Sequence, residues 1–268
     1  MCTIPPPPPP PPSHPAPPSL PPSSASKSDT SLSLSLSVCE WAAHEPQLRD
    51  ACAKNSICFH EAPFQFKYKN FVSILQLGPT CGLVALSMLL SGEVLPEELL
   101  NITKMEGYSN NGEMFSCKDM AKLAEKAISL ADMDVNVSVK TGGLFTEEII
   151  LELLNDAVLL VAYDADFNHS PCLRHGHTAH WALVCGVIVI SDPQGNYTAD
   201  PNNVYVLCKH GKSSFLAAWT LDELDKSNKN LWEFSPKKQE DGLLYVLPEG
   251  GVGGENGLRD QFLIFKGL

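Results

Sequence analysis

The sequence predicts an α+β fold in which a helical first half packs against a mainly antiparallel sheet formed by the second half. Apolar residues recur at helical spacing between residues 81 and 154. Short apolar or alternating runs, bounded by Gly, Asn, Asp and Pro, follow from residue 158 onward. A reactive cysteine lies in the first half and a histidine in the second, so a crevice between the halves is the expected place for a site.

Residues 1–37 are predicted to be a disordered tail outside this fold. Eight consecutive prolines occupy residues 5–12, and a Ser-rich stretch ends in alternating Ser and Leu at 31–37. Consecutive prolines adopt the polyproline II helix, and such a sequence buries too little apolar surface to offset the entropy of ordering. The tail can be a spacer, or a strip that docks in an aromatic-lined groove such as profilin, SH3 or WW domains offer. The folded domain is expected to span 38–268.

Local start signals place the helices of the first half. A mixed pattern suggests one near residues 41–54. The clearest helix starts at Cys81, because Gly78 and Pro79 end the preceding extended segment. Three or four helices are expected to follow, because three further signals each mark a first helical turn. The signals are a proline followed by acidic residues, a capping box, and a threonine before two glutamates. These starts lie at Pro96, Ser116 and Thr146.

The strands of the second half are predicted from short runs that are apolar throughout or that alternate with polar residues. Turn-forming residues separate them, which favours antiparallel neighbours. The predicted strands are 158–163, 180–190, 204–208, 243–247 and 262–265.

Composition excludes several classes of protein. The formal net charge of −12 argues against nucleic acid or an anionic membrane surface as partner, because either would be repelled. The nine cysteines contain no C-x-x-C pair and no metal-finger spacing, which is typical of thiols that stay reduced. The N-terminus lacks a signal segment, and no stretch approaches 18 uninterrupted apolar residues. A soluble, cytoplasmic protein is therefore expected.

Cys81 is the strongest candidate for a nucleophile. It falls at the first turn of its helix, where the positive end of the helix dipole and a nearby imidazole favour the thiolate. The pKa of this thiol is therefore expected to be lowered. The alternative is that Cys81 is a small core residue, as most free cysteines are.

His180 and Gln76 complete the candidate site. His180 heads a strong strand, so its side chain can enter the crevice while Trp181, on the opposite face, shields it. Gln76 lies five residues before Cys81 and can donate to an oxyanion together with the backbone N–H of Cys81. The alternatives are a hydrogen-bonded core histidine and an ordinary turn residue.

The group that would orient His180 stays open at this point. Asp192 follows on the same strand or in the next turn, Asp200 is a second candidate, and His210 closes the next strand. Both aspartates precede proline, and such pairs are usually turn formers.

A zinc site is a competing interpretation of the same segment. Cys172, His175, His177 and His180 supply four possible ligands within a short stretch. Their spacing matches no standard closed site, and the sequence has no His-Glu-x-x-His helix. We therefore expect no metal.

The assembled residues resemble the actin maturation protease family, cytosolic cysteine aminopeptidases similar to the C39-like branch of the papain-like peptidases. The resemblance covers about residues 71–252, and the proline-rich N-terminus also fits it. The stretches that carry the resemblance are 78–86, 112–116, 163–169, 176–181 and 211–213.

The resemblance implies removal of the acetylated N-terminal Met or Cys from newly made actin, with Cys81 as nucleophile, His180 as base and no cofactor. It also implies profilin, which carries actin and binds polyproline, as the partner of the proline run. Because both the actin N-terminus and this chain are acidic, either a local basic patch, such as Arg174, Lys209 and Lys212, or tethering through profilin is expected to overcome their repulsion. A deamidase or acyltransferase using the same Cys–His pair, or a non-catalytic adaptor for actin and profilin, remains the alternative.

Overall fold

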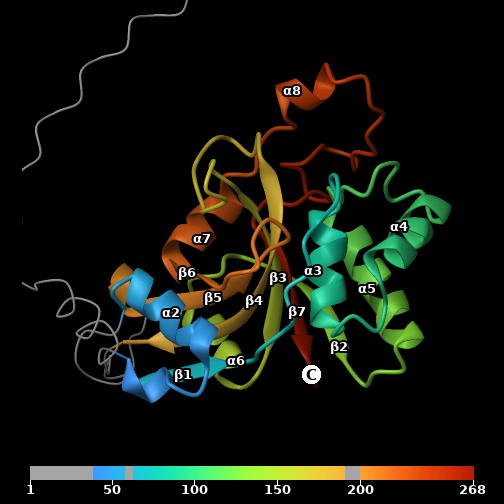
Figure 1. Cartoon of the computed structure of the whole chain (residues 1–268). Helices are drawn as coiled ribbons and strands as arrows, with labels where there is room; N and C mark the ends of the chain where they lie inside the picture. Colours follow the sequence, from blue (N-terminus) through green and yellow to red (C-terminus); the bar gives the residue numbers. More distant parts are fainter. Residues whose placement is uncertain (1–38, 58–62, 191–199) are drawn as a thin grey trace, which may run out of the picture.

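The computed structural model describes residues 39–57, 63–190 and 200–268, whose strands form one sheet (Figure 1). The proline run at 5–12, the predicted domain boundary at residue 38 and Asp192 lie outside the described residues. Among the residues that are described, no helix is long and apolar enough to cross a membrane.

The sheet has seven strands, and every pairing is antiparallel. Six strands run in the order β2-β7-β3-β4-β5-β6. The seventh, β1, pairs with residues 186–189 of β4, beyond the part of β4 that pairs with β3. The bounds are β1 Gln65–Tyr68, β2 Asn136–Thr141, β3 Val158–Asp164, β4 Ala179–Val189, β5 Val204–Lys209, β6 Ala217–Thr220 and β7 Gln261–Lys266.

Four of the five predicted strands are confirmed as β3, β4, β5 and β7. The strand predicted at 243–247 is wrong. Leu243 and Leu244 are exposed, and the carbonyl of Leu244 accepts hydrogen bonds from the side chains of Asn110 and Asn111 instead of joining a ladder. Its run of apolar residues therefore belongs to a surface loop.

The helix starts predicted from capping signals are also confirmed. The hydroxyl of Ser116 accepts from the N–H of Asp119, and that of Thr146 accepts from the N–H of Ile149. The helix expected near 41–54 is divided into a short 3₁₀ turn, η1, and α2. The bounds are η1 Glu40–Ala42, α2 Pro46–Lys54, α3 Cys81–Leu89, α4 Pro96–Met105, α5 Cys117–Leu130, α6 Glu147–Leu154, η2 Pro201–Asn203, α7 Leu221–Lys229 and α8 Pro236–Gln239.

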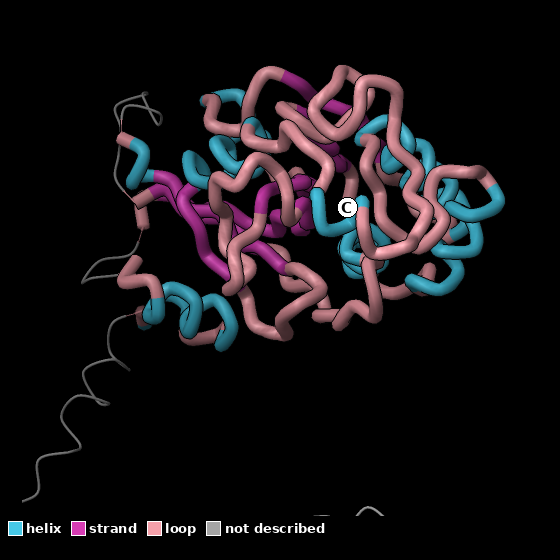
Figure 2. Tube along the Cα trace, turned by 90° about the horizontal axis from the view of Figure 1, so that it is seen from above, coloured by secondary structure: helices cyan, strands magenta, loops and turns pink. Residues whose placement is uncertain are grey.

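Helices cover both faces of the sheet (Figures 1 and 2). Alternate residues of β3 enter two different cores, as the period of a strand requires. Leu160 belongs to the core formed with α3 and α5, whereas Val161 belongs to the core formed with α6 and α7. Apolar side chains on both faces explain why β3 and β4 read as nearly continuous apolar runs.

The contact of α3 with β4 sets the geometry of the candidate site. Gly82 lies against the indole of Trp181, and a Cβ at this position would be 3.1 Å from Cδ1 of the ring. The indole N–H of Trp181 donates to the carbonyl of Met114 at 2.9 Å, which fixes the ring. Since Cys81 and His180 each adjoin one member of this contact, the packing holds the two at a defined separation.

Candidate active site

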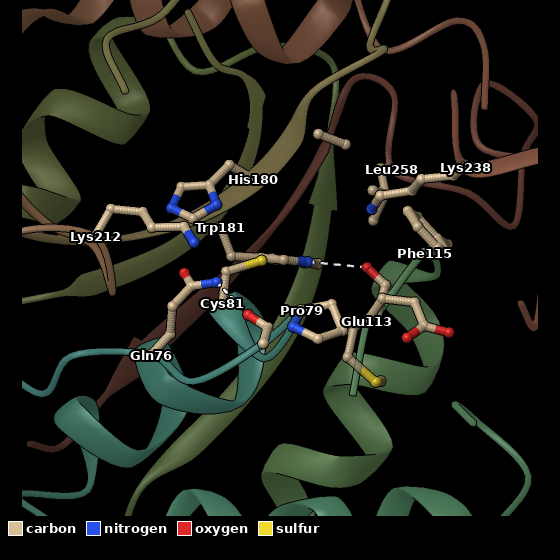
Figure 3. A pocket seen from close by; sticks show the side chains of 13 residues that line it. Gln76, Pro79, Cys81, Glu113, Phe115, His180, Trp181, Lys212, Lys238 and Leu258 are labelled. Carbon is tan, nitrogen blue, oxygen red and sulfur yellow. Dashed lines mark hydrogen bonds between the residues drawn. The ribbon is translucent and has the colours of Figure 1, made fainter. Parts of the chain in front are cut away.

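Cys81, His180 and Gln76 line one cavity of about 200 Å³ (Figure 3). Cys81 is the first residue of α3, His180 is the second residue of β4, and Gln76 lies in the loop before α3. The fold therefore brings together the three residues singled out from the sequence. The remaining lining residues are Gly78, Pro79, residues 113–115, Ala179, Trp181, Lys212, Lys238 and Leu258.

The thiol of Cys81 is almost fully buried at the floor of this cavity. Burial raises its pKa, and the backbone N–H groups of Trp181 and Gly82 and the charges of Lys238 and Lys212 lower it by less. The expectation of a lowered pKa is thus wrong, because desolvation outweighs the hydrogen bonds at the helix start and the nearby cations. The resting form of Cys81 is the neutral thiol.

The imidazole of His180 is also buried, with 6% of its surface exposed. Its pKa is lowered from 6.5 to about 3, first by burial and then by the neighbouring His210, His169, Lys212 and Lys238. His180 is therefore neutral near pH 7. A neutral imidazole beside a thiol can take the thiol proton when the sulfur attacks a carbonyl.

Gln76 is held by contacts on both sides. Its backbone N–H donates to the carbonyl of Gly211 at 2.8 Å, and its side-chain Nε2 donates to the carbonyl of Gly78 at 2.7 Å. Gly211 must lack a side chain, since a Cβ there would be 2.9 Å from the Cβ of Gln76. The amide nitrogen of Gln76 lies towards Cys81 (Figure 3), and only one of its two hydrogens is used in the bond to Gly78. It can serve an oxyanion together with the N–H of Cys81, which has no partner within its helix.

Two further charged groups of the cavity were not identified from the sequence. Glu113 is 3% exposed, its Oε2 has no hydrogen-bond partner, and burial raises its pKa. Lys238 lies over the ring of Phe115, 5.0 Å from its centroid. Both reach the cavity from segments distant in sequence from Cys81 and His180. Glu113 lies in the stretch 112–116 that carries the family resemblance, but no local pattern assigns it or Lys238 to the site.

Only one member of the expected basic patch borders the cavity. Lys212 does, whereas Lys209 is buried elsewhere and donates to Gln47 and Ser73. The guanidinium of Arg174 stacks on Phe167, 4.5 Å from the ring centroid. Lys212 and Lys238 are thus the cations at this site, and neither lies within ion-pair distance of a carboxylate in residues 39–57, 63–190 and 200–268.

Asp200 is not placed to orient His180. Its Oδ1 accepts from the N–H of Asn202 at the start of η2, next to the end of β4 that is remote from His180. The strand between them corresponds to roughly 30 Å at the usual rise per residue.

The alternative zinc set is dispersed. Nε2 of His177 lies 2.9 Å from Oε2 of Glu233, and His180 instead contacts His169 and His210. No group of three or more His, Cys, Asp or Glu side chains within the described part of the chain is arranged to hold a metal ion.

Acid is expected to destabilise the folded chain between about pH 6.5 and 4, because two histidines are buried in the neutral form. The pKa of His180 is lowered from 6.5 to about 3 and that of His210 from 6.5 to about 4, each mainly by burial. In this interval the unfolded chain binds protons that the folded chain does not, so stability present above pH 6.5 is lost as the pH falls. Urea midpoints at about pH 7.5 and about pH 4.5 measure the loss. The His180→Gln variant should lose less stability over the same pH interval. A loss equal to that of the wild type would contradict the burial of His180 in its neutral form.

This chain is similar to a described protein family and to several proteins of one name. The model of the family described as "Actin maturation protease-like, C-terminal domain" matches residues 71–188, which include Cys81 and His180. An actin maturation protease of Drosophila melanogaster is 39% identical over 230 residues, covering 86% of this chain and 82% of the relative. The Danio rerio protein of the same name is 38% identical, covering 74% and 73%. The Homo sapiens protein is 36% identical, covering 67% and 60%.

Proposed function

This chain belongs to the actin maturation protease family, and we propose that it is a cysteine-type aminopeptidase that removes the acetylated N-terminal Met or Cys from newly synthesised actin. Its relatives are named proteases of actin maturation, which supports a peptidase with a role in that process. The observation that carries the finer proposal is the convergence of Cys81, His180 and Gln76 on one small cavity.

In the proposed mechanism, His180 accepts the proton of the Cys81 thiol as the sulfur attacks the carbonyl of the first residue. The oxyanion of the tetrahedral intermediate receives hydrogen bonds from Nε2 of Gln76 and the N–H of Cys81. Collapse breaks the peptide bond, and His180 returns its proton to the leaving amine of the shortened actin. Water, deprotonated by His180, then hydrolyses the thioester and releases the acetylated residue.

The size and charge of the cavity support an acetylated single residue as the group removed. A volume of about 200 Å³ suits one capped residue better than a longer peptide. Acetylation removes the positive charge of the terminal amine, which would otherwise lie near the two lysines of the cavity. The same lysines attract an acidic chain that continues out of the mouth, although the protein as a whole is acidic.

The proposal is tested by intact mass of actin that carries an acetylated N-terminal Met or Cys, with and without the protein. The expected result is a decrease by the mass of that one acetylated residue. An unchanged mass of actin with retained binding would favour the adaptor. A change in mass without loss of a residue would favour a deamidase or acyltransferase.

Lys238→Glu is expected to lower kcat/KM for an acidic N-terminal peptide by roughly tenfold, the effect of about 1.4 kcal/mol. The loss should be smaller for a peptide whose acidic residues are replaced by Ser, and smaller at high salt, because the effect is electrostatic. Lys104→Glu on α4 is the matched control, since Lys104 is exposed and does not line the cavity. Equal losses for both peptides would contradict a role in reading acidic substrates.

Deleting residues 1–30 is expected to lower cleavage of actin presented on profilin and to leave cleavage of a short acetylated peptide nearly unchanged. A polyproline strip docked on the carrier raises the effective concentration of the actin N-terminus at the cavity. Replacing residues 5–12 by Gly and Ser is the length-matched control, because it keeps the spacer and removes the polyproline conformation. Equal rates on profilin-bound actin for the full-length and Gly/Ser proteins, with a lower rate for the deletion, would reduce the tail to a spacer. Equal rates for all three proteins would show that the tail plays no part in cleavage.

A further inference from the structure

The unsatisfied nitrogen of His180 raises the question of what holds this ring in place. A Cys–His pair uses one ring nitrogen towards the sulfur, and a third group normally binds the other to fix tautomer and orientation. Nε2 of His180 is buried and has no hydrogen-bond partner. A buried donor left in this state costs about 1–3 kcal/mol, so an acceptor close by is expected.

No carboxylate in the described part of the chain is hydrogen-bonded to Nε2 of His180. Asp200 lies by the remote end of β4. Asp164 uses its Oδ2 to accept from the N–H groups of Arg174 and Gly176, and its buried Oδ1 has no partner. Asp164 also follows Tyr163 in β3, and it is Tyr163 whose ring contacts His180, so the Asp164 side chain leaves the opposite face of the strand.

His210 has the position and the free nitrogen that the role requires. It directly follows β5, whose last residue, Lys209, pairs with Leu183 near the start of β4. The centroid of its ring is 5.8 Å from that of His180, in an edge-to-face arrangement. Its Nδ1 is buried and likewise has no partner. Two rings at this separation can join by an N–H···N hydrogen bond that tightens when substrate binds, or through one water.

The surroundings of His210 favour an acceptor. The ring stacks on Trp219 of β6, with centroids 6.0 Å apart and planes 20° apart, which restricts its rotation. Burial lowers its pKa to about 4, so near pH 7 one of its two nitrogens carries no proton.

His169 is an equally near neighbour that lacks these features. Its ring centroid is 5.9 Å from that of His180, but it lies on a partly exposed loop, and neither of its ring nitrogens is buried without a partner. It borders a second cavity of about 230 Å³, which His210 also lines. His169 is therefore the matched control for His210.

We propose that His210 is the positioning residue of this site, accepting the Nε2–H of His180 and thereby turning the other ring nitrogen towards Cys81. The inference rests on the proposed function. It assigns to a neutral imidazole the place that the aspartate or asparagine of other cysteine peptidases would take.

Substitution of His210 is expected to affect turnover far more than binding. His210→Ala should lower kcat about 100-fold with little change in KM, because His180 loses its orientation but the cavity keeps its walls. His210→Asn, whose side-chain oxygen can accept the same hydrogen, should recover most of this loss, whereas His210→Phe should not. His169→Ala should stay within about threefold of the wild type. Thermal unfolding of each variant shows whether it is folded. If His210→Ala does not fold, the comparison of His210→Asn with His210→Phe still tests the proposal.

A pH profile of Cys81 alkylation by iodoacetamide separates orientation from a structural effect and needs no actin. The groups around His180 are Cys81 of α3, Tyr163 of β3, His169, His210, Lys212 and Lys238. His210→Asp adds a carboxylate to this set, which favours the imidazolium of His180 and a thiolate beside it. Alkylation should then extend to lower pH than in the wild type.

Two results would overturn the proposal. One is an unchanged kcat in His210→Ala. The other is a loss of kcat that His210→Asn does not restore, found together with an alkylation profile of His210→Asp that is not shifted in pH. Failure of the proposed actin cleavage would instead appear as inactivity of the wild type with the alkylation shift of His210→Asp intact.

Discussion

Cys81→Ala is expected to lower the rate of actin N-terminal cleavage by at least about 10⁴-fold while leaving the fold unchanged. Among the cysteines of the described residues, Cys81 alone lines the cavity, and an alanine methyl group replaces the buried thiol with little loss of packing. The measurement is a single-turnover time course followed by intact mass, with thermal unfolding of the variant. Cys172→Ala is the matched control, because Cys172 lies in the loop that leads into β4 and is more exposed than Cys81. Comparable losses in the two variants would exclude Cys81 as the sole nucleophile.

Thiol labelling gives an independent measure of the same assignment. Burial raises the pKa of Cys172 to about 11, so its exposure is offset by a small thiolate fraction. Under limiting iodoacetamide, loss of activity should follow modification of Cys81. Inactivation that follows modification of Cys172 or Cys208 would show that the nucleophile is wrongly assigned.

His180→Ala is expected to lower kcat by about 10³-fold, within the range that a positioned general base contributes. Among the described residues, no other imidazole lines the cavity to take the proton of the thiol, whose pKa is raised by burial. His177→Ala should retain most activity, since His177 pairs with Glu233 outside the cavity. A chelator should have no effect on the wild type. Activity that a chelator removes and zinc restores would support the metal interpretation instead.

The pH dependence of kcat in the wild type tests the assignment of His180 as the general base. A general base works only when unprotonated, and the pKa of His180 is lowered from 6.5 to about 3. The acid limb of kcat should therefore lie well below pH 6.5, as far as the folded protein persists. A limb centred near 6.5 would indicate an exposed imidazole as the base.

The elements with local start signals could be predicted, whereas those defined by distant partners could not. Ser116 and Thr146 announce α5 and α6 because their hydroxyls cap the first turn. β2 pairs only with β7, far along the chain, and its side chains are mostly exposed or half-buried. β1 is likewise exposed on most of its residues, so neither strand carries an apolar run of its own.

The site divides in the same way. Cys81, His180 and Gln76 could be predicted because each stands beside a turn, a helix start or a strand start that defines its direction. Glu113 and Lys238 could not, because only the tertiary fold carries them to the cavity. The charge state of Cys81 could also not be predicted from the sequence. A helix start favours a thiolate, and only the structure shows how completely Cys81 is desolvated.

The order of the strands has a consequence for biosynthesis. β7 is the last of the seven to leave the ribosome, yet it lies between β2 and β3, pairing with both. Until it emerges, β3 presents an open edge and β2 has no partner, so the layer beneath Cys81 and His180 cannot close. Pairings of such long sequence separation form slowly. A nascent chain should therefore acquire catalytic competence only once residues 261–266 can pair, and their loss should expose the edge of β3 and leave β2 without this partner.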